Sequence, residues 1–244
     1  MGAAALAFAV PVAVLFLRSL EFDGVFPTLG QYYELLITNY TFLNYFWNSV
    51  AYSSVITAGC VTVSFPLGFL FAKVKFPGRN AAFFFYLLMM LLPFQSTLLP
   101  NYIQLRSLGL LDMPAALVLP TLFSPFAVFL FRQFIVAIPD SLIECASLDT
   151  SSALAIYRHV VFPQVKHAAV ALSVLIFCES WNMVEQAIIF AAGNPDIRPL
   201  SVVLDSMPAN VSFSAAFVYI FPALFLFFRF KDALVDSISG IGWK

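Results

Sequence analysis

The feature that most constrains the fold is a run of residues, Trp47 to Ala72, without a single charged side chain. This run is longer than the roughly 20 apolar residues that a helix needs to cross a bilayer. Across the 244 residues, 61% are hydrophobic and only 10% are charged, whereas soluble domains carry about 25% charged residues. The sequence therefore indicates an all-α membrane protein, because strands of a membrane barrel would be half as long and would alternate in polarity.

Other apolar stretches are long enough to accompany this run, and six transmembrane helices are predicted within one transmembrane domain, residues 1–244. The predicted spans cover about residues 1–18, 47–72, 80–100, 115–137, 167–191 and 210–228. The first stretch lacks the basic residues that open a cleaved signal peptide. This favours a membrane span, whose basic leader is missing from the chain, over a signal peptide. Prolines within the spans are expected to kink several helices, which favours a bent bundle over a straight one. They are Pro66, Pro93, Pro120, Pro125 and Pro222.

Basic residues are distributed unevenly between the two sides that six spans would define. The loops after spans two and four, together with the C-terminal tail, hold nine of the Lys and Arg residues, and the other loops hold three. Because cytoplasmic loops carry the excess of Lys and Arg, both termini and the segment 139–163 are predicted to be cytoplasmic. The nine are Lys73, Lys75, Arg79, Arg132, Arg158, Lys166, Arg229, Lys231 and Lys244.

The segment 139–163 is polar although it lies between two long apolar spans. Ser141 and Glu144 have the spacing of a capping box, which predicts a helix from Ser141 to about Leu148. Turn-forming residues at 149–151 interrupt it, and a second helix is predicted to end at Pro163. Its apolar residues follow helical spacing on one face: Ala153, Ile156, Tyr157, Val160 and Val161. Two readings remain open, an amphipathic segment lying on the lipid surface and a docking site for a cytoplasmic partner.

This segment resembles the EAA loop of permeases from ATP-binding-cassette (ABC) importers. Glu144, Cys145 and Ala146 take the places of E-A-A, Thr150 falls on the glycine, and Phe162-Pro163 falls on the closing L-P. Asp149 and Val160 also match, at the acidic position before the glycine and at the aliphatic position. Three more stretches resemble the second permease subunit of maltose-type, binding-protein-dependent carbohydrate importers: LLPFQSTLLPNYIQLRSLGLLD (91–112), SPFAVFLFRQF (124–134) and ESWNMVEQAIIF (179–190).

The resemblance implies a sugar-importing permease in a bacterial plasma membrane that is not itself an enzyme. The implied partners are a second, different permease, an extracytoplasmic solute-binding protein, and two cytoplasmic ATPase subunits that bind ATP and Mg. The residues implied in ATPase coupling are Glu144, Cys145, Ala146, Asp149, Thr150, Ile156 and Tyr157. The main departure from the family pattern is Thr150 in place of the glycine, because threonine is poorly suited to a backbone with positive φ. Either the corner uses an ordinary turn or the loop meets its ATPase at a changed angle.

Polar residues in the predicted fifth span suggest a solute pathway. Glu179 would lie near the middle of that span, where an ionised carboxyl is costly, and Asn182 and Gln186 would share its face. Trp181 and Glu185 would form a neighbouring pair, and aromatic rings beside polar groups suit sugars. Gln95 is a weaker candidate, as is Thr97, because either could bond to backbone freed by nearby prolines. The alternative for the Glu179 group is polar contact with a partner permease.

Several functions are disfavoured by what the sequence lacks. It has no phosphate-binding GxxxxGK[ST] loop, no metal-ligand spacing and no catalytic triad pattern, so neither a cofactor nor a nucleic acid is predicted for this chain. A self-contained, proton-coupled secondary transporter using Glu179 is the main alternative. That class often contains inverted repeats, and no repeated half is present. A membrane-embedded enzyme using Glu179 and Glu185 would lack a nucleophile.

Overall fold

The protein is described by a computed structural model that covers residues 2–38, 40–150 and 152–241. These residues form helices and connecting turns, with an isolated bridge between Phe22 and Val25 and no named strand. Four helical segments are long and apolar enough to cross a membrane, or up to five if one bent pair counts as a single span. The all-α membrane class is thus confirmed. The count of six spans stays a prediction, because the side chains of α1 (Gly2–Ser19) are described only from Val10 onward.

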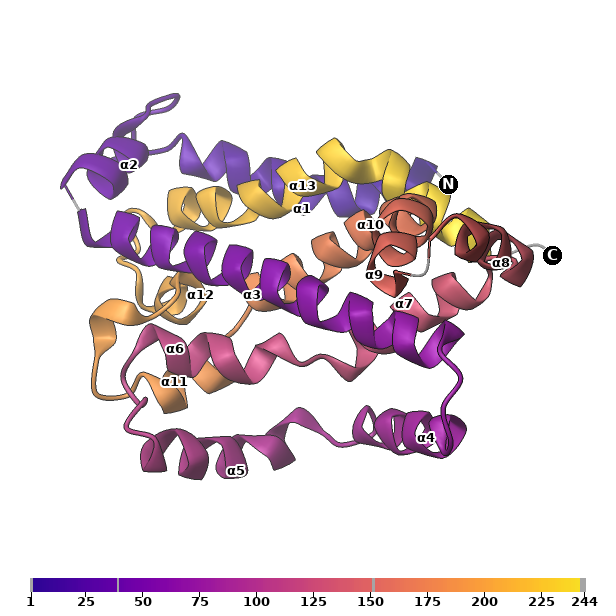
Figure 1. Cartoon of the computed structure of the whole chain (residues 1–244). Coiled ribbons are helices and arrows are strands. Elements are labelled where there is room, and N and C mark those ends of the chain that lie inside the picture. Colours follow the sequence, from indigo (N-terminus) through magenta and orange to yellow (C-terminus); the bar gives the residue numbers. More distant parts are fainter. Residues whose placement is uncertain (1, 39, 151, 242–244) are drawn as a thin grey trace.

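The longest helix, α3 (Tyr40–Lys73), runs through the middle of the molecule, and α1 lies beside α13 (Ser212–Ile241) along one side of it (Figure 1). Helix α3 continues through Pro66, and α13 continues through Pro222. The start of α1 and the end of α13 lie at the end of the molecule that holds α8 (Asp140–Asp149) (Figure 1). The short helix α2 (Gly30–Tyr33) and a π-helical turn, Glu34–Thr38, lie at the opposite end.

The predicted third span is not one helix. It consists of α4 (Arg79–Met89) and α5 (Phe94–Ser107), whose axes differ by 96°. The bend falls at Pro93, which has extended backbone with φ −63° and ψ 139°. Proline has no N–H to continue a helix and clashes with the preceding turn, so the chain changes direction there.

The predicted fourth span is broken by its prolines. Helix α6 (Pro114–Val118) passes into a 3-10 turn, Leu119–Leu122, and α7 (Pro125–Val136) begins after an extended Phe123 and Ser124. The Ser124 hydroxyl accepts a hydrogen bond from the Ala127 N–H at 3.2 Å and caps α7. The break leaves polar backbone and short polar side chains in the middle of an apolar segment.

The predicted boundaries of the fifth span were wrong at both ends. One helical segment runs from α9 (Ala153–Ile156) through a π-helical turn, Tyr157–Val161, into α10 (Phe162–Trp181). Pro163 does not end it, because the Phe162 N–H bonds to the Tyr157 carbonyl five residues back and the wider turn accommodates the proline. The helix ends at Trp181, ten residues before the predicted boundary at 191. A separate helix, α11 (Glu185–Phe190), follows. Two 3-10 turns, Pro195–Ile197 and Leu204–Ser206, and the short helix α12 (Leu200–Val203) then connect it to α13.

The main core forms where α3, α7 and α10 pack together. Ile56, Phe131, Val161 and Leu172 are among the residues buried there. Close approach of α3 and α7 depends on Gly68, since a Cβ added at this position would lie 2.6 Å from the Phe131 Cβ and 3.1 Å from the Arg132 backbone nitrogen. Neither neighbour can move without shifting α7 itself.

Gly68→Ala is therefore expected to destabilise the protein by about 1–3 kcal/mol, the usual cost of overpacking. Gly59→Ala in the same helix is a matched control, because its added Cβ would meet only the flexible end of Leu122. Thermal unfolding in detergent should show a lower midpoint for Gly68→Ala and little change for Gly59→Ala. Equal midpoints for the two variants would show that the α3–α7 approach is not tight.

Candidate coupling segment and interior cavity

The segment between α7 and α10 is fastened to the bundle at its start. The Lys73 ammonium donates to the Asp140 carboxylate and to the Ile138 carbonyl, each at 2.6 Å. This hydrogen bond and the positive charge of Lys73 hold the pKa of the Asp140 carboxyl below its usual range. The helix begins at Asp140, after Pro139, and no side chain caps it. The predicted capping box at Ser141 is therefore not formed.

The corner after α8 uses ordinary backbone. Thr150 has φ −150° and ψ 137°, an extended conformation open to any residue. The Thr150 hydroxyl accepts from the Ser152 N–H at 3.2 Å, and the Ser152 hydroxyl accepts from the Ala155 N–H at 3.3 Å. A threonine therefore fits this position without strain. Of the two explanations for Thr150 in place of glycine, the structure supports the ordinary turn. Ser151 lies outside the described residues.

The predicted coupling residues fall into two groups. Glu144, Cys145 and Asp149 are exposed on α8, while Ala146 and Thr150 are half-buried. Ile156 is buried in the main core. Tyr157 is half-buried, with its ring 4.5 Å from the Phe65 ring. The apolar face predicted for the second helix therefore packs against the protein.

Two exposed leucines next to the corner were missed by the sequence reasoning. Leu148 is 87% exposed and Leu154 is 71% exposed. They lie on either side of the turn, off the apolar face defined by helical spacing, so a periodicity argument passes over them. Together they add apolar surface to the open side of this corner.

A cavity of about 850 Å³ lies where the two broken spans meet the end of α10. Its walls combine apolar side chains with scattered polar groups from α5, the α6–α7 break, α10 and α11. The polar residues are Thr97, Asn101, Thr121, Ser124, Glu179, Ser180 and Gln186. Such a mixture, mainly apolar with a few placed polar groups, is typical of a small-molecule site.

Of the predicted pathway residues, Glu179 and Gln186 line this cavity. Glu179 is exposed in the last turn of α10, rather than halfway along a helix as predicted. Gln186 is buried, and its side-chain amide donates to the Leu117 carbonyl at 3.4 Å. The predicted common face of Glu179, Asn182 and Gln186 was wrong, because Asn182 ends the helix with φ −90° and ψ 17°.

Trp181 and Asn182 form a packed joint with α13 and do not line the cavity. Trp181 is 1% exposed, and its indole N–H donates to the Tyr219 carbonyl at 3.1 Å. Its ring is stacked on Phe177 at 5.8 Å. The Asn182 amide oxygen accepts from the Tyr219 hydroxyl at 2.8 Å. Trp181 is therefore packed against α13, whereas Asn182 is exposed and hydrogen-bonded to it.

Gln95 and Glu185 meet each other instead of the cavity. The Gln95 amide lies 3.3 Å from both carboxylate oxygens of Glu185, and both residues are exposed. The predicted pairing of Glu185 with Trp181 is absent, because these residues belong to different helices. Thr97 does line the cavity, and its hydroxyl donates to the Phe94 carbonyl at 2.7 Å.

The remaining polar cavity residues were not predicted. Asn101, Thr121 and Ser124 occur singly among apolar residues, and Ser180 lies beside Glu179 in the sequence. Prolines were the available signal, since Thr121 and Ser124 lie between Pro120 and Pro125, where the helix breaks. Within the described part of the chain, no cluster of three or more His, Cys, Asp or Glu side chains is placed to hold a metal ion.

Span-length helices around a polar-lined cavity are the arrangement expected of a membrane transport component. The family described as "Binding-protein-dependent transport system inner membrane component" matches residues 64–240, and the chain belongs to this family. The family predicted from the sequence motifs is thereby confirmed, as is a multi-pass membrane subunit rather than an enzyme.

Similar proteins include the sn-glycerol-3-phosphate transport system permease protein UgpE. The protein from Brucella abortus (strain 2308) is 32% identical over 165 residues, which cover 68% of this chain and 55% of that one. The protein from Shigella flexneri serotype 5b (strain 8401) is 36% identical over 141 residues, covering 56% and 50%. The chain thus spans about half the length of these relatives.

A solved structure shares the fold. It is a chain of a bacterial ABC transporter involved in the import of the acidic polysaccharide alginate, with a TM-score of 0.84. The match covers 95% of this chain and 92% of that chain at 19% sequence identity.

Proposed function

We propose that this chain is the permease subunit of an ATP-driven importer for a sugar, an oligosaccharide or a related hydroxylated solute. The names of its relatives point to glycerol 3-phosphate and to alginate, both rich in hydroxyl or acidic groups. The chain forms one permease domain with six spans and cytoplasmic termini. It works with a second permease, two ATPase subunits that hold ATP and Mg, and an extracytoplasmic binding protein.

One observation supports the ATPase-docking role of α8 and α9 most strongly. The apolar face of the second helix, including Ile156 and Val161, is buried in the bundle core. That face is therefore not available to lie on lipid, which removes the reason for reading the segment as a lipid-surface helix. The side left open carries Glu144, Cys145 and Asp149 beside Leu148 and Leu154. A mixed apolar and acidic surface on a fastened corner fits a protein partner.

The cavity is the proposed solute path. Its carboxylate, amides and hydroxyls can bond solute hydroxyls, and its aromatic side chains can cover apolar sugar faces. Glu179 is the only charged residue among those that line it in the described chain. We assign the principal contact with the solute hydroxyl groups to Glu179, with Gln186 as a secondary contact.

Uptake by the reconstituted complex tests both proposals. Uptake of radiolabelled sn-glycerol 3-phosphate, alginate oligosaccharides and maltose into proteoliposomes should require ATP and Mg and persist with a protonophore present. Glu179→Gln should lower uptake of the transported solute about tenfold or more, because a neutral amide accepts a weaker hydrogen bond than a carboxylate. Glu185→Gln is the matched control and should leave uptake unchanged, since Glu185 lies outside the cavity lining.

Other results would point elsewhere. Uptake that continues without ATP and collapses with the proton gradient would establish the secondary-transporter alternative. If Glu179→Gln transports normally but no longer co-purifies with the second permease, the residue belongs to a subunit contact instead of the solute path.

A further inference from the structure

A second hollow lies where the chain turns from α3 into α4. Five residues connect the end of α3 at Lys73 with the start of α4 at Arg79. Gly78 has φ +79° and allows the chain to reverse. A cavity of about 290 Å³ forms at this corner. It is lined by Lys75, Phe76, Gly78, Arg79, Asn80 and Ala81.

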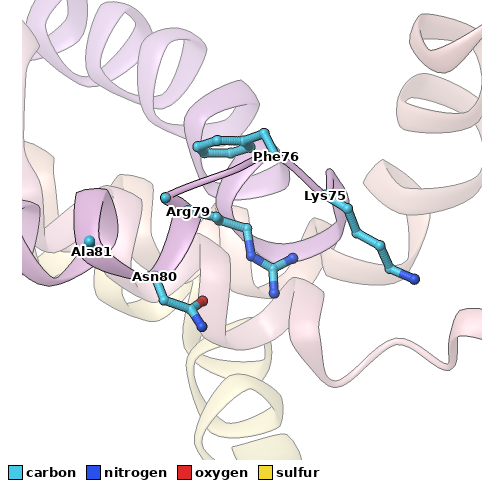
Figure 2. Close-up of a pocket in the computed structure, with 6 residues that line it drawn as sticks. Lys75, Phe76, Arg79, Asn80 and Ala81 are labelled. Atoms are coloured by element: carbon cyan, nitrogen blue, oxygen red, sulfur yellow. The ribbon is translucent and has the colours of Figure 1, made fainter.

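Three polar side chains line this hollow. Figure 2 shows Lys75, Arg79 and Asn80 extending to the same side of the corner, while the Phe76 ring lies on the other side. One guanidinium nitrogen of Arg79 donates to the Val74 carbonyl at 3.4 Å, which holds the side chain over the turn. Two cations and a neighbouring amide that line one hollow provide donors for a phosphate group.

The two cations are not neutralised within the described part of the chain. Neither Lys75 nor Arg79 has a carboxylate oxygen within 4.0 Å there. Asp140, the acidic residue that Lys75 influences through space, is hydrogen-bonded to Lys73. No side chain caps α4, so the N–H groups of its first turn add positive potential at the same place. The corner therefore carries excess positive charge around a space large enough for a phosphate.

The surface below the hollow indicates which molecule brings the phosphate. Ala81 lines the hollow, and Phe84, Phe85 and Leu88 follow it at helical spacing on α4. These three larger side chains are exposed. A charged hollow that continues into an exposed apolar stripe matches a phospholipid, whose phosphate is joined to acyl chains. A free phosphate ion would make no use of the stripe.

We propose that this corner binds the phosphate of an anionic phospholipid, with its acyl chains along Phe84, Phe85 and Leu88. The assignment to the cytoplasmic leaflet, but not the chemistry, rests on the proposed function and its topology. Basic pockets on the cytoplasmic side of membrane helices suit anionic headgroups. The bound lipid would hold α3 and α4 together on the side of the molecule from which α8 is fastened through Lys73.

Native mass spectrometry of the purified transporter, titrated with phosphatidylglycerol or phosphatidylcholine, tests this proposal. The wild type should retain phosphatidylglycerol in preference to phosphatidylcholine. The double variant Lys75→Gln/Arg79→Gln should bind phosphatidylglycerol about tenfold more weakly, because two surface cations are lost. Arg106→Gln/Lys231→Gln is the matched control, since it removes two exposed charges away from the corner, and it should bind like the wild type.

Several results would overturn the proposal. They are equal binding of the two lipids, unchanged binding by the corner variant, or an equal loss in the control variant. Inorganic phosphate that binds the corner as tightly as the lipid would assign the site to a free anion instead. If the corner variant does not fold, Lys75→Arg/Arg79→Lys keeps both charges and should retain the lipid. If the lipid proposal fails, ATP-dependent uptake is still expected. A failure of the lipid proposal is therefore distinguishable from a failure of the proposed function.

Discussion

Glu144→Lys is expected to separate the chain from the ATPase proposed to dock on α8 while leaving the fold intact. Glu144 is exposed on α8, and among the described residues no carboxylate–cation pair involves it. A carboxylate at a protein interface is matched by donors or cations of the partner, and reversing its charge places like charges together at a cost of several kcal/mol. ATPase co-purification and solute-stimulated ATP hydrolysis should therefore fall about tenfold or more.

The control for Glu144→Lys is the same charge reversal at Asp205. Asp205 is exposed in the turn Leu204–Ser206, far along the chain from α8. Both variants should unfold at the wild-type temperature, and Asp205→Lys should retain the ATPase. If Glu144→Lys co-purifies with the ATPase as the wild type does, α8 is not the docking element and the role proposed for this segment fails.

Trp181→Ala is expected to have the largest effect on stability. The Trp181 ring fills the joint between α10 and α13, where Phe46, Phe177 and Tyr219 surround it with ring centroids 5.5–5.9 Å away. Truncation would leave a cavity and remove the indole donor to the Tyr219 carbonyl. Truncating a buried aromatic residue in this way costs about 3–5 kcal/mol. Thermal unfolding in detergent should show a clearly lower midpoint.

Two further variants make the Trp181 result interpretable. Trp47→Ala changes the same residue type at a position that is 62% exposed, and it should alter the midpoint little. Trp181→Phe keeps most of the ring contacts and should recover much of the lost stability. If instead Trp181→Ala unfolds like the wild type but loses solute uptake, the ring contacts solute, as the sequence suggested, and its packing is secondary.

Helices and their approximate order follow from the sequence because long uncharged runs leave few alternatives in a membrane. The interruptions were harder to place. Pro93 produced a sharp bend, whereas α3 and α13 continue through Pro66 and Pro222. Proline removes the same N–H in each case, but neighbouring helices decide whether the freed carbonyl and the local strain are accommodated.

The candidate sites, too, could be predicted from the sequence only in part. The EAA-like motif could be located from its spacing alone, and α8 with its corner lies there. Which side of it stays open could not be predicted, because Ile156 is buried by side chains that are distant in sequence, such as those of α3. Likewise, helical spacing placed Glu179 and Gln186 together for the wrong reason. They share a cavity across the end of a helix, not along one face.

The sequence by itself determined that this chain is an all-α membrane protein of the binding-protein-dependent importer family, since composition and ordered motifs depend only on local chemistry. Only the tertiary structure decided that Trp181 is buried against α13, that Glu179 and Gln186 line a cavity, and that Lys75 and Arg79 line one hollow. The physical reason is that burial and charge pairing depend on which helices come together. That in turn depends on where each helix bends or ends, which residue spacing alone does not specify.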